Sequence, residues 1–198
     1  MKRLVWMVFI DFLLLMVIAI ITNWVLTLKA ADEVAKADVG NIIDKSEFLI
    51  EMTWENGSTN DVDLWIANPV GDLCSYQRKD IGLMTLDRDD LGITNNRIET
   101  ENGTIENNSR REVGSIRGVI PGRYVINTKL YGKKAGPSEV TITIRKLNPY
   151  REILTKKITL TDEKEEKTIA SIDIDKDGNV VSVDQITQEV LSTRGQLK

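Results

Sequence analysis

The feature that most constrains this chain is a long apolar stretch near its start. Leu4 to Leu28 is apolar except for Asp11 and three uncharged polar residues. As a helix, about 25 residues at ~1.5 Å each reach roughly 37 Å, more than the ~30 Å hydrocarbon core of a bilayer. Lys2 and Arg3 precede the stretch, and the positive-inside rule then places the N-terminus in the cytoplasm. The sequence therefore predicts that residues 1–28 are a retained, single-pass transmembrane helix with a short cytoplasmic start.

The remainder of the chain has a different pattern. Residues 29–47 mix alanine with charges and predict a helical connector or plug, while residues 185–198 form a C-terminal tail. Between them, residues 48–184 show short alternating runs divided by turn residues, which is typical of an antiparallel β-sandwich of the immunoglobulin or jelly-roll kind. The clearest predicted strands are 48–54, 62–68, 112–119, 122–132 and 138–147. The polar segment 87–111 is expected to be one long surface loop.

Composition excludes several classes of function. The net charge of −4 offers no basic surface for a phosphate backbone, so nucleic acid is not an expected partner. The chain has no histidine, the usual general base and a common metal ligand, and we do not expect an enzyme. Its single cysteine, Cys74, is interpreted as a small core residue, with intermolecular pairing as the alternative.

Asp11 is the residue of interest in the apolar stretch. A carboxylate inside a bilayer costs ~2.5–3.5 kcal/mol at the centre, so such residues usually face a protein interior or an ion pathway. A carboxyl that alternates between neutral and charged forms can carry protons, and a membrane potential can drive the cycle. The alternative is a tolerated polar residue in a plain anchor.

The run VFIDFLLLMVIAIIT, Val8 to Thr22, resembles the transmembrane helix of the ExbD, TolR and MotB family of proton-channel (stator) subunits. The resemblance implies that Asp11 translocates protons and that two copies of the helix sit in a pentameric ring of a polytopic ExbB/TolQ/MotA-like membrane protein. It also implies a bacterial inner-membrane location with the C-terminal domain in the periplasm. The helix residues implied to face the ring are Phe12, Leu15, Ile18 and Thr22.

The outer segment resembles a second family. TWENGSTNDVDLWIANPVGDLCSY, LDRDDLG and GVIPGRYVINTKLYGKKAGPSEVTITI are similar to bacterial extracytoplasmic β-sandwich domains with no assigned activity. This resemblance covers roughly residues 48–147. It implies a sandwich fold but no ligand.

Two groups of acidic residues are candidate calcium sites, since calcium prefers hard carboxylate oxygens. The first could bring together Asp61, Asp63, Asp87, Asp89 and Asp90, with solvated loop charge as the alternative. The second, Asp173, Asp175, Asp177 and Gly178, matches the opening of an EF-hand loop. Asp184 stands where the bidentate glutamate belongs, and a hairpin closed by DKDGN explains this second group better.

Two functions follow as hypotheses. The first is a homodimeric subunit of a proton-driven rotary motor, in which Asp11 carries protons and the β-domain engages an unknown periplasmic ligand. The alternative is a membrane-tethered binding module for glycan, protein or cell wall, without ion transport. No cofactor other than calcium is expected.

Overall fold

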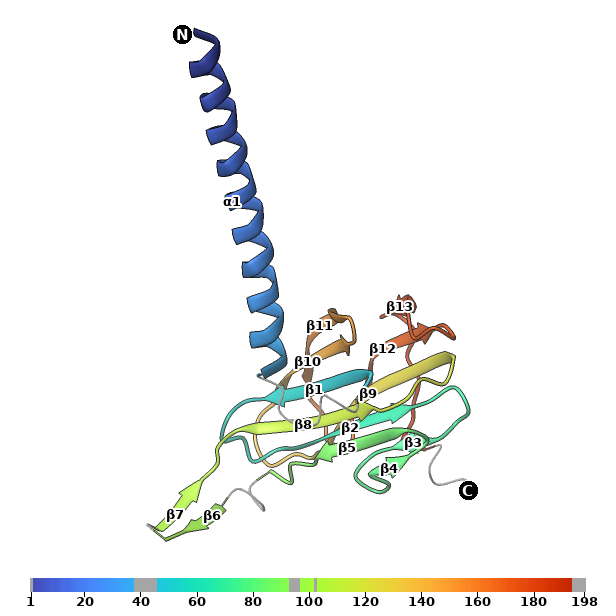
Figure 1. The fold of residues 1–198 in the computed structure, drawn as a ribbon. Helices are drawn as coiled ribbons and strands as arrows, with labels where there is room; N and C mark the ends of the chain where they lie inside the picture. Colours follow the sequence, from blue (N-terminus) through green and yellow to red (C-terminus); the bar gives the residue numbers. More distant parts are fainter. Residues whose placement is uncertain (1, 38–45, 93–96, 102, 194–198) are drawn as a thin grey trace. The chain divides into compact units, whose positions relative to one another are not determined.

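The computed structural model describes residues 2–37, 46–92, 97–101 and 103–193. The chain divides into two compact units, residues 1–44 and 45–198. The described part of the first unit is the helix α1 (Lys2–Ala37), and the described strands belong to the second unit (Figure 1). Residues 38–45 of the expected connector lie outside the described residues.

The helix overturns the membrane prediction. In the part of the chain that the structure describes, no helix is long and apolar enough to cross a membrane. The apolar stretch within α1 carries Asp11, and charged residues occur towards both ends of the helix. The predicted transmembrane helix, and with it the single-pass inner-membrane location and periplasmic domain, is therefore wrong.

The prediction of an antiparallel β-sandwich is confirmed. One sheet has the strand order β11-β10-β1-β8-β5-β4, and the other has the order β13-β12-β9-β2-β3. The first sheet contains β1 (Phe48–Trp54), β4 (Asp80–Ile81), β5 (Met84–Arg88), β8 (Arg110–Ile116), β10 (Ser138–Leu147) and β11 (Tyr150–Leu160). The second contains β2 (Asp61–Ala67), β3 (Leu73–Cys74), β9 (Gly122–Gly132), β12 (Glu166–Ile174) and β13 (Val180–Asp184).

The core forms because alternate residues of these strands point between the sheets. From β1, for example, Ile50 and Met52 are fully buried, and Leu64 and Ile66 of β2 meet them from the other sheet. Cys74 is also buried in this core, as predicted, and is a free thiol. The alternation that identified the strands is therefore the alternation that buries them.

The segment expected to be one long loop contains a hairpin instead. Within it, β6 (Arg97–Thr100) pairs with β7 (Gly103–Glu106), and this two-stranded ribbon extends beyond the sandwich (Figure 1). The described side chains of the ribbon are exposed, so it has few apolar contacts to signal it in the sequence.

The DKDGN segment closes a hairpin, as predicted. The Asp175 carboxylate accepts hydrogen bonds from the Asp177 and Asn179 amides at 2.9 and 2.8 Å, and Gly178 has a φ of +77°. Strands β12 and β13 pair on either side of it. The acidic side chains here shape a turn.

Candidate cation site

The candidate site lies where β2 of one sheet meets β8 of the other. Strand β2 pairs with β9 along its length but with β3 only at Ile66 and Ala67. In its first half, the Leu64 amide instead donates a hydrogen bond to Glu112 Oε2 on β8, at 2.7 Å. This bond joins the two sheets and fixes Glu112 beside Asp63.

Three acidic side chains converge at this junction. Asp63 of β2, Asp89 just after β5 and Glu112 of β8 each offer one carboxylate oxygen, and these oxygens all lie within 4.8 Å of one another. Asp63 is 3% exposed and Glu112 is fully buried. Two carboxylates on strands of different sheets and a third just after β5 thus share one largely buried site.

Several oxygens at this site have no hydrogen-bond partner among the described residues. Asp63 Oδ2 and Asp89 Oδ1 are buried and unpaired in this part of the chain, and so is Asp61 Oδ1 on the same face of β2. Asp89 Oδ2 forms an ion pair with Lys79 Nζ, at 2.8 Å. An unpaired buried acceptor is costly, which leaves this site short of positive charge or donors.

The electrostatics agree with the geometry. Burial, followed by repulsion from Asp61 and Asp89, raises the pKa of Asp63 to about 8. Burial, followed by repulsion from Asp63, raises the pKa of Glu112 well above its usual range. Burial and the charge on Asp89 also raise the pKa of Asp61. Without a cation, the folded protein must therefore hold protons at this site near neutral pH.

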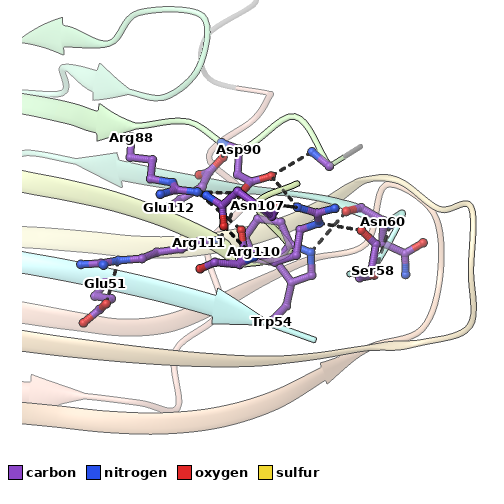
Figure 2. Close-up of polar contacts among 12 residues, drawn as sticks. Glu51, Trp54, Ser58, Asn60, Arg88, Asp90, Asn107, Arg110, Arg111 and Glu112 are labelled. Atoms are coloured by element: carbon purple, nitrogen blue, oxygen red, sulfur yellow. Dashed lines mark hydrogen bonds and ion pairs between the residues drawn. The ribbon is translucent and has the colours of Figure 1, made fainter. Parts of the chain in front are cut away.

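Asp90, which follows Asp89 in the sequence, has a structural role (Figure 2). Its amide donates to Glu112 Oε1 at 3.4 Å, while its carboxylate turns to the arginines of β5 and β8. Arg110, 1% exposed, lies 3.8 Å from Asp90 Oδ1 and donates to the Ser58 carbonyl at 2.7 Å. The Asp90 amide therefore helps to orient Glu112, and its carboxylate balances a buried guanidinium.

The structure separates the five predicted aspartates. Asp63 and Asp89 belong to the site, and Asp61 lies close enough to raise the pKa of Asp63. Asp90 pairs with arginines, and Asp87 pairs with Arg117 at 3.2 Å outside the group. Calcium itself stays a prediction.

Glu112 is the site residue that the sequence prediction missed. It was assigned to the start of a strand, and its place in the pattern gave a usable signal. Residues 112, 114 and 116 alternate onto one face of β8, and Gly114 on that face lies against Ile66 and Leu64. A glutamate on the inward face of a core strand needs a partner, which marks it as a candidate.

The predicted ion-pathway residues lie on α1. Asp11 is exposed, as are Phe12, Leu15, Ile18 and Thr22, and the Thr22 hydroxyl bonds the Ile18 carbonyl. Because no described helix crosses a membrane, the motor function and proton-channel role inferred for the chain are wrong. The expected homodimer and polytopic partner were deduced from that function, and no observation tests them.

Comparisons with known proteins identify no family for the chain. No family model matches it, and no curated protein does. Neither the resemblance to the ExbD, TolR and MotB family nor that to the extracytoplasmic β-sandwich family is supported, and both assignments are wrong. Two solved structures are similar to it. One, described as the unknown function protein SAV2460, aligns at 10% identity and a TM-score of 0.47 over 76% of this chain and 95% of that one. The other, a homologue of the telluride resistance protein TerD from Streptomyces coelicolor A3(2), aligns at 12% identity and a TM-score of 0.42 over 75% and 95%.

Proposed function

We propose that the β-sandwich is a divalent-cation-binding module and that calcium is the cation. The observation that carries the proposal is the group of Asp63, Asp89 and Glu112, each of which offers one oxygen within 4.8 Å of the others. Among the described residues, Asp63 Oδ2 and Asp89 Oδ1 have no hydrogen-bond partner. Calcium holds its oxygen ligands at ~2.3–2.6 Å, so ligands on opposite sides of one ion are about 5 Å apart. The spread of the three oxygens fits that span.

The charge at this site is compatible with a bound cation. The three carboxylates come from strands of both sheets, and when ionised they repel one another across the junction. A divalent cation removes this repulsion and ties β2 to β8 and to the end of β5. Binding is therefore expected to stabilise the sandwich.

Calcium is favoured over magnesium by the kind of site. Magnesium holds ligands at ~2.0–2.1 Å in a strict octahedron and usually keeps several waters, whereas calcium accepts irregular sets of carboxylates. The role is one of binding, and the absence of histidine favours no catalytic step. The immunoglobulin-like or jelly-roll-like connectivity expected from the sequence stays a prediction, and the proposal does not depend on it.

Thermal unfolding of the full chain in EDTA and in calcium tests this function. At a free calcium concentration 100 times Kd, binding should add about 2.7 kcal/mol to the free energy of unfolding and raise Tm. Asp63→Asn should remove the response. Asp87→Asn is the matched control, since Asp87 is a buried carboxylate near the site that pairs with Arg117.

The proposal fails if wild type unfolds at the same temperature in EDTA and in calcium. It fails equally if the two variants respond to calcium alike, since the ion would then bind elsewhere. Magnesium at the same concentration should give a smaller shift.

A further inference from the structure

The C-terminal residues 188–192, here called the strap, are docked on the outer face of the second sheet. Leu191 is fully buried and packs with Trp65, Ala67 and Val125, which point away from the main core. This small cluster is separate from the core between the sheets. The strap therefore covers an apolar patch that the sandwich does not cover itself.

Polar side chains of β9 and β12 anchor the strap. The Glu166 carboxylate accepts hydrogen bonds from the Leu191 and Ser192 amides at 2.7 and 3.3 Å. Asn127 Nδ2 donates to the Glu189 carbonyl at 2.6 Å, and the Thr168 hydroxyl receives a bond from the Glu189 amide at 2.8 Å. The anchors hold the strap through its backbone.

Lys129 stands between the strap and the cation site. On β9 it lies directly opposite Asp63 of β2 and directly opposite Glu166 of β12, so the three side chains form one row across three strands. Directly opposed residues share a face of the sheet. Its ammonium donates to Ser192 Oγ at 2.8 Å and lies 5.8 Å from the centre of the Trp65 ring.

We propose that cation binding and docking of the strap are coupled through Lys129, with the cation tightening the strap. The inference rests on the proposed cation site. Without the ion, the unpaired Asp63 oxygen offers the Lys129 ammonium a second acceptor in competition with Ser192 Oγ. With the ion bound, that oxygen becomes a ligand and the ion repels the ammonium, so Lys129 is directed to the strap. Cation binding thus strengthens a contact made by the far end of the chain.

Hydrogen exchange of the full chain tests the coupling. In calcium, the amides of residues 188–192 should exchange about five-fold or more slowly than in EDTA, which is the lower end of ordinary coupling between sites. Lys129→Met keeps the apolar stem beside Trp65 but removes the charge. In this variant strap exchange should no longer respond to calcium, while calcium should bind at least as tightly. Lys157→Met, which removes an ammonium paired with Glu139 on the other sheet, should behave as wild type.

Linkage supplies a second readout. Because coupling is reciprocal, a chain ending at Gln185 should bind calcium more weakly by the same factor by which calcium slows strap exchange. Calcium binding without a change in strap exchange overturns the coupling and leaves the cation site standing. Faster strap exchange in calcium overturns it as well. If the wild-type chain fails to bind calcium at all, the proposed function itself fails.

Discussion

Replacing Asp63 with asparagine should prevent most of the loss of stability that the cation-free protein undergoes between pH 4 and pH 7. The residue is 3% exposed, and burial with the charges of Asp61 and Asp89 raises its pKa to about 8. In the unfolded chain its pKa is near its ordinary value of ~3.9. Between these values the unfolded state has lost a proton that the folded state still holds, so stability falls as pH rises.

The magnitude follows from the size of the shift. Each pH unit in this window costs about 1.4 kcal/mol, so raising the pH from 4 to 7 should cost wild type about 4 kcal/mol through this one group. Asparagine is neutral at both pH values, so the variant does not lose this stability as the pH rises. Glu112 is present in both proteins, and burial, the largest cause of its raised pKa, is unchanged by the substitution. Asp63→Asn should therefore gain about 4 kcal/mol over wild type between pH 4 and pH 7.

Urea unfolding in EDTA at the two pH values measures this double difference. Comparing the change with pH removes effects of altered packing, which are the same at pH 4 and pH 7. Asp87→Asn, which removes the partner of Arg117 outside the acidic group, is the matched control. The reasoning is refuted if the free energies of unfolding of Asp63→Asn and wild type differ by the same amount at pH 4 and pH 7. If the variant instead loses stability relative to wild type at pH 7, the sign of the effect is wrong.

Three further predictions concern the scaffold. Arg110→Met should lower the free energy of unfolding by about 3–5 kcal/mol in a urea titration. Arg110 is buried, and its loss leaves the Asp90 carboxylate without that guanidinium. A loss below about 1 kcal/mol would contradict this prediction. Gly114→Ala should lower the free energy of unfolding by about 1–3 kcal/mol in the same assay, because a Cβ there would lie 2.6 Å from Ile66 Cδ1. An unchanged urea midpoint would contradict this prediction and show that the core side chains move aside at little cost. Burial raises the pKa of the Cys74 thiol to about 12, so it should react with a thiol reagent only on unfolding, and rapid labelling of the native chain would contradict its burial.

The strands that period-two alternation predicts are those that bury one face in the core. β1, β9 and β10 begin and end at the predicted residues, since Gly122, Gly132 and the flanking turns mark their limits. The short strands β3, β4 and β5 were not predicted, because two to five residues carry too little periodicity. The β6–β7 ribbon was missed because none of its described side chains is buried.

The site was predicted only in part because it is assembled between sheets. Asp63 and Asp89 were identified from acidic runs, but their meeting with Glu112 depends on how β2 crosses β8. Nothing in the local pattern separates them from Asp87, which pairs with an arginine instead. The membrane assignment was wrong because it depended on the apolar length of one segment, and the role of Asp11 depended in turn on that assignment.

Titration of calcium into the EDTA-treated full chain, measured by isothermal titration calorimetry, tests the central claim most directly. The account predicts saturable binding at one ion per chain, lost in Asp63→Asn and in Glu112→Gln and retained in Asp87→Asn. Calcium binding in Asp63→Asn and Glu112→Gln as tight as in wild type would contradict a cation site built on Asp63, Asp89 and Glu112. The absence of binding heat in wild type at millimolar calcium would contradict it as well.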